Sequence, residues 1–437
     1  MRWLIVLLLL VVMTSCGVPE APLAQVAPPS PAPVASATVA LVPVQATVAP
    51  QPSVVQSVEP SAVAMAASGG ELPSVIDGPQ PGPGEVLLRD AWGASARPAN
   101  VIQTRYMLYS ESTPAQEDGP VPAKTTLWKI DLSDTSQRTR LFDIPFPFYA
   151  NSLIYGELSP DTTYLTYLQT GAVMDDLAEL IVSRLDGSDM HLVAEHISAA
   201  GGVQPQFTWS SDSTKIAYIV PEEKGQAFYV YDLQTKASTL LYAHTGGGRL
   251  GAWLDNERVL VFLVTEQEKP MQMTALNNTS GAQEILGEFP RWGDVTVAVS
   301  PDRTQLLISE YIYEIRTGQF TSLENVQTLG FWSPYGDTIV LSPGRDEVGL
   351  HLLPVVEKSG SSVALFSPTD RGKTIIINGF SPDGRYLSVC QGSGNTTSFA
   401  QYVFRDLLYD IWQNQWIVLT QGLYAQGVQC GRLIGWL

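Results

Sequence analysis

Cysteine, histidine and positive charge are all scarce in this chain of 437 residues, and each shortage excludes a class of protein. Three cysteines and four histidines, with no cysteine pair at CxxC spacing, argue against a dedicated zinc site. The chain has 25 Lys and Arg against 43 Asp and Glu, which gives a formal net charge of −18. This acidic balance argues against nucleic acid as a partner and against electrostatic docking on anionic lipid.

Long apolar runs are also scarce, and the one that stands out lies at the N-terminus. Residues 3–13 follow Arg2 without a polar interruption. The run is too short for a stable transmembrane helix but fits the core of a signal peptide. The small residues just before Cys16 resemble a bacterial lipoprotein signal, in which Cys16 becomes the lipidated first residue. An ordinary secretory signal with an incidental cysteine is the alternative.

Aromatic residues, lysine and arginine are absent between residues 17 and 84, which hold fourteen of the 31 prolines. Such a stretch cannot form a packed core and favours extended conformations. We therefore expect a lipoprotein signal peptide over residues 1–15, a disordered Pro/Ala/Val-rich tether over 16–84 and a folded domain over 85–437. An exported, membrane-anchored position on the extracytoplasmic side of a bacterial cell envelope follows from the signal.

Helical periodicity is scarce in the folded part, where a short turn cassette recurs instead. Its fullest copy is Ser381-Pro382-Asp383-Gly384. Proline suits the second position of a tight turn, aspartate the third and glycine the fourth. Apolar and β-branched residues flank the turn on both sides, so the cassette predicts a β-hairpin.

Weaker copies of the cassette recur at intervals of about 33–51 residues, the range of one propeller blade. They are Ser159-Pro160-Asp161, Ser210-Ser211-Asp212, Leu254-Asp255-Asn256, Ser300-Pro301-Asp302 and Ser333-Pro334-Tyr335. Each interval has room for two further strands, and a four-stranded sheet buries both of its faces only when such sheets stack radially. Residues 432–437 and 105–109 supply the inner strands of one more sheet. The sequence thus predicts an all-β propeller of seven four-stranded blades, closed by N- and C-terminal strands, with six blades as the alternative.

Residues from about 100 to 437 resemble the WD40-like, TolB-type (PD40-repeat) β-propeller family, whose repeats carry a Trp/Phe-Ser-Pro-Asp-Gly hairpin. The resemblance implies the propeller fold and, by analogy, protein partners in the cell envelope. The motif says almost nothing about a specific ligand.

Aromatic residues before the turns could form a sugar-binding set, but their recurrence at one repeat position favours packing between blades. They are Trp209, Trp253, Trp332, Phe380 and Trp436. Because loops on a rigid scaffold usually carry function, we expect a binding surface among the long inserts 111–124, 144–152, 264–283, 343–349 and 392–400.

Two cysteines remain once Cys16 is assigned to the lipid. In an oxidising compartment Cys390 and Cys430 are candidates for a disulfide between the last complete blade and the closing strand. Two buried free thiols are the alternative.

The sequence favours a non-enzymatic binding module over an enzyme. We expect a monomer that binds a protein or an envelope polymer, meets the membrane only through its N-terminal lipid, and has no nucleic-acid partner, catalytic residue, metal or cofactor. The alternative is a propeller-type enzyme, similar to a lactonase or a cyclase, with its site in the central channel.

Overall fold

Strands and tight turns make up all the secondary structure that the computed structural model describes. It describes residues 74–77, 103–113, 124–145, 149–150, 153–154, 156–169, 177–198, 206–266, 269–290, 295–323, 330–336, 338–341, 350–354, 363–366, 373–393, 403–423 and 432–437. Within these ranges there is no helix of the length and apolar character needed to cross a membrane. All of them lie in one structural unit, residues 67–437.

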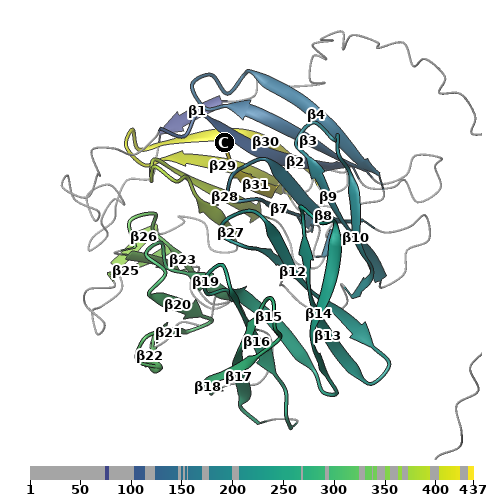
Figure 1. Ribbon diagram of the computed structural model, residues 1–437. Helices are drawn as coiled ribbons and strands as arrows, with labels where there is room; N and C mark the ends of the chain where they lie inside the picture. Colours follow the sequence, from purple (N-terminus) through teal and green to yellow (C-terminus); the bar gives the residue numbers. More distant parts are fainter. Residues whose placement is uncertain are drawn as a thin grey trace, which may run out of the picture. The chain divides into compact units, whose positions relative to one another are not determined.

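The strands form seven successive sheets, which we call blades 1 to 7 (Figure 1). Blade 1 consists of β31 (Arg432–Trp436), β2 (Tyr106–Thr113), β3 (Lys124–Asp131) and β4 (Arg138–Pro145). Blade 2 consists of β7 (Gly156–Leu158), β8 (Tyr164–Gln169), β9 (Leu177–Arg184) and β10 (His191–Ser198). Blade 3 consists of β11 (Phe207–Trp209), β12 (Lys215–Glu222), β13 (Gly225–Asp232) and β14 (Ala237–His244).

The remaining blades repeat this order. Blade 4 consists of β15 (Gly248–Trp253), β16 (Arg258–Leu263), β17 (Met271–Asn277) and β18 (Gln283–Phe289). Blade 5 consists of β19 (Val297–Val299), β20 (Gln305–Ile308), β21 (Tyr311–Glu314) and β22 (Gln319–Ser322). Blade 6 consists of β23 (Gly330–Trp332), β24 (Thr338–Leu341), β25 (Leu350–Pro354) and β26 (Val363–Phe366). Blade 7 consists of β27 (Lys373–Phe380), β28 (Tyr386–Ser393), β29 (Val403–Asp410) and β30 (Gln415–Leu423).

Three further strands lie outside this pattern. β5 (Tyr149–Ala150) and β6 (Leu153–Ile154) form a small sheet between blades 1 and 2 in the chain. β1 (Ser74–Asp77) pairs antiparallel with β30 and gives blade 7 a fifth, outermost strand. β1 lies inside residues 16–84, the range expected to be tether, and at these four residues the structure shows a strand.

The ring closes in blade 1, where the last strand of the chain pairs with the first strand of the ring. β31 is antiparallel to β2, with Met107 opposite Trp436. Tyr106 and Leu437 exchange two backbone hydrogen bonds, of 3.0 and 2.8 Å, at the place where the other blades have a covalent turn. Such closure leaves no open inner edge. Together with the seven sheets, it confirms the predicted propeller of seven blades closed by N- and C-terminal strands.

Apolar side chains fill the space between each pair of neighbouring blades. One buried cluster lies at each of the seven interfaces between blades. One residue from each side of every interface, starting between blades 1 and 2 and ending between blades 7 and 1, gives the pairs Leu127–Tyr167, Leu180–Trp209, Phe228–Trp253, Phe262–Tyr313, Leu307–Trp332, Val340–Leu387 and Tyr386–Met107. Burying one large aliphatic or aromatic side chain is worth about 1.5–3 kcal/mol. Opening the ring at any interface would expose such a cluster, which makes the ring a rigid scaffold.

The tryptophan before the turn connects neighbouring blades by a polar contact as well. The indole Nε1 of Trp209 donates to the carbonyl of Glu157, 3.3 Å away in the preceding blade. Trp253 and Trp332 repeat this contact at 3.0 Å to the carbonyls of Thr208 and Ala298. The three side chains are 4%, 2% and 8% exposed. The prediction that these aromatic residues pack between blades, and do not form a sugar-binding set, is confirmed for them.

Candidate functional site

The two faces of the ring carry different kinds of connection. We call one the turn face: it holds the turns between the first and second, and between the third and fourth, strands of each blade. The opposite loop face holds the connections between the second and third strands and those between blades. The length of the connections on the loop face varies, from residues 223–224 in blade 3 to the much longer stretch 114–123 in blade 1. The blades therefore differ most in the length of their loop-face connections.

The inserts predicted to bind a partner gather at the loop face. The strand ends that flank 111–124, 144–152, 343–349 and 392–400 all lie on this side, although most residues of these inserts lie outside the described part of the chain. The fifth predicted insert, 264–283, is longer than the connection in the structure. Only residues 264–270 connect strands at the loop face, since β17 occupies 271–277 and the turn after it lies on the turn face.

A serine and an aspartate organise each complete turn on the turn face. The serine Oγ donates to the aspartate two residues later and accepts from the backbone N–H five residues later. The Ser–Asp distances are 2.6 Å for Ser159–Asp161, 2.7 Å for Ser210–Asp212, 2.7 Å for Ser300–Asp302 and 2.6 Å for Ser381–Asp383. The amides that donate to these serines, at 2.8–2.9 Å, are those of Tyr164, Lys215, Gln305 and Tyr386. The serines are 0–3% exposed, so their hydroxyls are structural groups.

In blades 2, 3, 5, 6 and 7 the fourth residue of the turn between the first and second strands has a left-handed backbone. Glycine fills this place in two blades, as Gly336 (φ +73°) and Gly384 (φ +66°). Thr162, Ser213 and Arg303 adopt the same conformation with φ of 60–61°. Left-handed backbone is unfavourable for residues with a Cβ, above all for a β-branched one. The surrounding hydrogen bonds of the turn hold these three residues in a strained conformation.

A side chain at position 384 is disfavoured by a close contact as well as by the left-handed backbone. A Cβ at this position would lie 2.6 Å from the hydroxyl oxygen of Tyr335 in blade 6. That hydroxyl donates to the carbonyl of Asp383 at 2.7 Å, so blade 6 caps the turn of blade 7. At Gly336 the nearest atom to an added Cβ belongs to Pro301, at an ordinary contact distance of 3.5 Å.

Neighbouring turns also contact one another around the turn face. The amide of Asp161 donates to Ser213 Oγ at 2.8 Å, which joins blades 2 and 3. Arg303 Nη2 donates to the carbonyl of Trp253 at 2.9 Å and joins blades 5 and 4. Ser211 and Asn256 are hydrogen-bonded between blades 3 and 4. These contacts link the turns of blades 2 to 5 to one another by hydrogen bonds.

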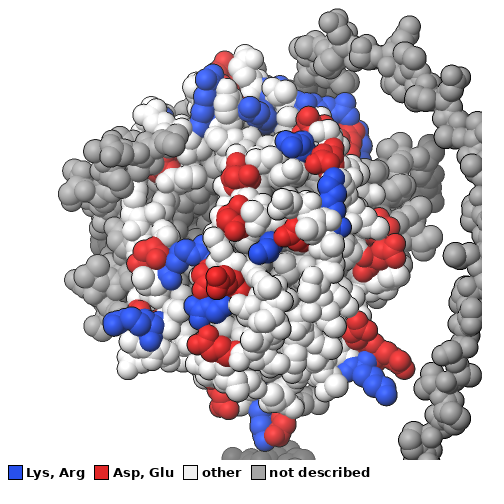
Figure 2. Space-filling model, viewed as in Figure 1, with Lys and Arg blue, Asp and Glu red and all other residues white. Residues whose placement is uncertain are grey.

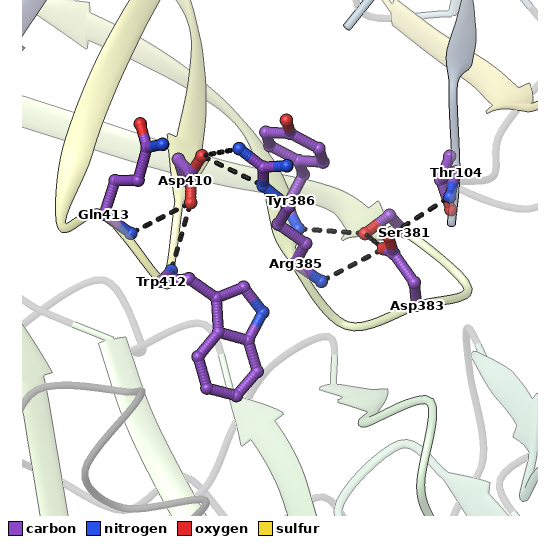
Figure 3. A network of polar contacts seen from close by, with 8 residues as sticks. All are labelled: Thr104, Ser381, Asp383, Arg385, Tyr386, Asp410, Trp412 and Gln413. Carbon is purple, nitrogen blue, oxygen red and sulfur yellow. Dashed lines mark hydrogen bonds and ion pairs between the residues drawn. The ribbon is translucent and has the colours of Figure 1, made fainter. Parts of the chain in front are cut away.

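A polar network of the turn face lies in blade 7, next to the closure (Figure 3). Asp410 accepts from Arg385 Nη2 at 2.7 Å and Nε at 3.1 Å, and from the amides of Trp412 and Gln413 at 3.1 and 3.0 Å. Asp383 accepts from the amide of Thr104, 3.1 Å away, just before β2. The network therefore ties both turns of blade 7 to the first residues of blade 1.

Hydrogen bonding lowers the pKa of several turn carboxylates. The Ser300 hydroxyl and the Thr304 amide hold the pKa of Asp302 below its ordinary value of 3.8. For Asp161 partial burial opposes ionisation, but hydrogen bonds from Ser159 and Thr163 outweigh it and the pKa is again lowered. These acidic groups are ionised and already occupied by the turns. The turn face thus uses these carboxylates to stabilise the ring.

Charged side chains elsewhere on the surface are mixed in sign. Figure 2 shows basic and acidic groups interspersed over the visible face. Between blades 2 and 3, Asp189 lies 2.8 Å from His191 Nε2 and 3.4 Å from Lys236 Nζ. Exposed pairs of this kind contribute little to stability. They also leave no broad patch of one sign on the face in view.

In the described ranges, no three His, Cys, Asp or Glu side chains come together as a metal site would require. Of the inner strands whose side chains are described, β7 carries Glu157 and β15 carries Arg249, both half-buried. Arg249 Nη1 donates to the carbonyl of Gly248 at 3.0 Å.

Cys390 lies within blade 7 and is disulfide-bonded. It is 1% exposed and pairs with Asp406 on the neighbouring strand. β28 continues to Ser393, so Cys390 lies inside its strand. Cys16 and Cys430 fall outside the described residues, and the pairing of Cys390 with Cys430 stays a prediction.

No protein-family model matches the chain, and no curated protein matches its sequence. Solved propeller structures are similar to it. TolB from Acinetobacter baumannii is 15% identical, with 76% of this chain and 82% of that chain covered and a TM-score of 0.38. The β-propeller domain of the Trilobed protease from Pyrococcus furiosus is 13% identical, with 73% and 98% covered and a TM-score of 0.47. Oligogalacturonate lyase from Vibrio parahaemolyticus is 12% identical, with 74% and 86% covered and a TM-score of 0.45.

Two features of the structure were not predicted from the sequence. The ion pair of Arg385 with Asp410 joins residues that no local pattern connects. The strand β1 did have a signal, because Pro73 and Gly78 bracket the short β-forming run Ser74-Val75-Ile76-Asp77. This short signal was outweighed by the Pro/Ala/Val-rich composition of the surrounding tether, which predicted disorder.

Proposed function

We propose that this chain is an exported, lipid-anchored propeller of the TolB type that binds a protein partner of the cell envelope through its loop face. An envelope polymer is the alternative ligand, and the tether over residues 16–84 holds the ring away from the membrane. The protein acts as a monomer and has no catalytic step of its own.

The observation that carries the proposal is the difference between the two faces. The serine hydroxyls and several aspartates of the turn face are used within the turns, and the turns between the first and second strands of blades 2, 3, 5 and 7 repeat one geometry. The loop face combines the same rigid ring with connections whose length changes from blade to blade. Variable loops on a rigid scaffold are the usual arrangement of a recognition surface.

Blade 3 offers matched positions for a test, because it is described on both faces. Glu223 and Thr245 are exposed at the loop face, whereas Gln234 is exposed at the turn face. A photo-crosslinking residue placed at each position of the full chain, in cells, would report what lies against that face. Pro301, exposed in a turn of blade 5, gives a second turn-face control.

We expect Glu223 and Thr245 to yield one or a few discrete protein adducts, and Gln234 and Pro301 to yield none. Adducts of equal yield from both faces would contradict the assignment of the loop face. Heterogeneous polymer-linked products from the loop-face positions would favour the envelope polymer over a protein.

The lipid anchor has its own test. In the wild-type chain we expect Cys16 to become the modified first residue and the protein to sediment with membranes until detergent is added. Cys16→Ser removes the only site for the lipid and should leave the signal peptide uncleaved at residue 15. Mass spectrometry of the N-terminal peptide distinguishes this from an ordinary secretory signal, which would release an unmodified, soluble chain.

A further inference from the structure

Blade 7 shows how the outer edge of a blade can be covered by an added strand. β1 runs antiparallel to β30 and covers the first four residues of that strand, with Ser74 opposite Val418 and Asp77 opposite Gln415. Val418 is 5% exposed, and the three residues before it are half-buried. A short piece of extended chain is thus enough to pair with this edge.

The outer hairpin of blade 3 has the same turn as that of blade 7. Residues 233–236 connect β13 to β14, and residues 411–414 connect β29 to β30. In each turn the aspartate that ends the third strand accepts from the backbone amide three residues later, at 2.8 Å in blade 3 and 3.0 Å in blade 7. The last residue of each turn is left-handed, with φ of +55° and +51°. In chain order these residues are Asp232, Thr235 and Lys236 in blade 3, and Asp410, Gln413 and Asn414 in blade 7.

The two hairpins also share a β-bulge at the same distance from the turn. The pairing with the third strand slips by one residue at Leu241 in β14 and at Leu419 in β30. In both strands the extra residue is buried, with 8% and 3% exposed. Leu240 therefore holds the place of Val418, and residues 237–240 correspond to residues 415–418, the stretch that β1 covers.

Exposure separates these two corresponding edges. All four residues from Ala237 to Leu240 are exposed, and Leu240 is 51% exposed, against 5% for Val418. Within the described residues, β14 is the terminal strand of its sheet, whereas β30 is not. Blade 3 therefore presents, uncovered, the edge that carries β1 in blade 7.

Leu240 is one of three exposed apolar residues along the outer edges of consecutive blades. Leu192 in β10 and Ile285 in β18 also precede a bulge, and they are 47% and 68% exposed. We call Leu192, Leu240 and Ile285 the rim row. An open edge with exposed apolar side chains is a surface to which a further strand can add.

Of the three edges of the rim row, that of β14 is the least protected against pairing. β10 has the exposed Glu195 and a second register shift beside the left-handed His196 (φ +60°). β18 carries Glu284 and Glu288, both exposed, on either side of Ile285. Charges and irregular backbone on an edge are the usual means of preventing the addition of a strand. β14 contains no Lys, Arg, Asp, Glu or Pro.

β1 also indicates what kind of segment fits this edge. It holds the β-branched pair Val75-Ile76 followed by Asp77, and its C-terminal end meets the turn of the hairpin. In blade 3 the corresponding end of an added strand lies beside Lys236, whose side chain is 51% exposed and whose Nζ is 3.4 Å from Asp189. Because an exposed pair of this kind is weak, Lys236 can also attract an acidic residue of the added strand.

We propose that the edge of β14 binds an extended segment of a partner protein, which pairs antiparallel with residues 237–240. The segment has apolar, β-branched residues in its middle and an acidic residue at its C-terminal end, like β1. It completes blade 3 as a fifth strand, as β1 completes blade 7. This surface is a contact separate from the loop face.

A synthetic peptide with the sequence of residues 72–79, Leu-Pro-Ser-Val-Ile-Asp-Gly-Pro, serves as the probe. A cysteine replaces its serine, which in blade 7 lies opposite Val418, and the full chain carries Leu240→Cys at the corresponding place. We expect disulfide exchange to capture this peptide several-fold more efficiently at Leu240→Cys than at Ile285→Cys, the matched site on the protected edge of β18. Peptide mass spectrometry locates the bond against the natural cysteines.

A control peptide tests whether capture depends on strand pairing. Consecutive backbone N–H groups of a strand point to opposite sides, so proline in place of both Val and Ile removes one that faces β14. This peptide keeps its cysteine and its acidic residue. We expect the excess capture at Leu240→Cys to be lost with it.

Hydrogen exchange gives a readout that needs no engineered bond. With the serine-containing peptide, the amides of β14 in the full chain should exchange several-fold more slowly, and those of β18 should not change. Leu240→Lys places a charge on the edge and should abolish this protection. Because Leu240 is exposed, the urea midpoint of Leu240→Lys should stay near that of the wild type.

Photo-crosslinking in cells tests for the natural partner. A photo-crosslinking residue at Ser238, on the same face of β14 as Leu240, should yield a discrete protein adduct, and adding Leu240→Lys should remove it. Adducts at the loop-face positions Glu223 and Thr245 with none at Ser238 would refute this second surface while leaving the loop-face proposal intact.

Three further outcomes would overturn the proposal. Equal capture at Leu240→Cys and Ile285→Cys, or by the proline peptide, would show collision without pairing. Slow exchange of β14 that is present without peptide at every protein concentration would show that the chain covers this edge itself. Slow exchange that appears only as the protein concentration rises would assign the edge to a second copy.

Discussion

Replacing Ser300 by alanine tests whether the turn serines stabilise the ring. Ser300 is 3% exposed, its Oγ accepts from the amide of Gln305 at 2.9 Å, and it donates to Asp302 Oδ1 at 2.7 Å. Ser300→Ala leaves that amide without its partner, and an unsatisfied, largely buried N–H costs about 1–3 kcal/mol. We expect the free energy of unfolding to fall by about 2 kcal/mol, measured at pH 7 as a lower urea midpoint with an unchanged slope.

The same variant has a distinct dependence on pH. The hydroxyl of Ser300 is the largest cause that lowers the pKa of Asp302 below 3.8 in the folded protein. A lowered folded pKa contributes stability that is present above the unfolded pKa and is lost as the pH falls through the folded value. The difference between wild type and Ser300→Ala should therefore be largest above pH 3.8 and shrink in more acidic solution.

Ser322→Ala provides the control, because Ser322 is an exposed serine on the outer strand of blade 5. Such a surface change should alter stability by no more than about 0.5 kcal/mol. Equal destabilisation by Ser300→Ala and Ser322→Ala would contradict the stabilising role of the Ser300 hydroxyl. A difference from wild type that stays constant as the pH falls would refute the part assigned to Asp302.

Three further changes probe the turns and the closure. Gly384→Ala should destabilise the protein by about 2–4 kcal/mol, because it combines the strain of a left-handed backbone with loss of the Tyr335 hydrogen bond. Gly336→Ala, which adds only the backbone strain, should cost about 1 kcal/mol. Comparison of the urea midpoints of the two variants checks this difference. Thr162→Gly should stabilise by about 0.5–1 kcal/mol, because the relief of a strained β-branched residue exceeds the added freedom of the unfolded chain, and a lower thermal midpoint would contradict it. Non-reducing peptide mapping should recover Cys390 linked to Cys430, and Cys430→Ser should lower the free energy of unfolding by about 3–4 kcal/mol; recovery of Cys390 linked to another chain would disprove the pairing.

The repeat pattern allowed most of the fold to be predicted. Ser381-Pro382-Asp383-Gly384 and its weaker copies mark turns that the structure has in those places, because a tight turn depends on the residues within it. The recurrence of tryptophan before the turn correctly indicated packing between blades. The candidate site could be predicted only in part: the sequence indicates five inserts, but their common position at the loop face depends on the direction of the flanking strands.

The amino-acid sequence by itself determined the repeating hairpin, the all-β class and the complementary end strands that close the ring. Local turn chemistry and alternating apolar residues encode these features without reference to distant parts of the chain. Only the tertiary structure decided that β1 lies on β30, that Tyr335 makes glycine necessary at position 384, and that Leu192, Leu240 and Ile285 line up along the rim. Each of these depends on which segments meet across blades, and backbone pairing between strands leaves no fixed mark in the sequence of either partner.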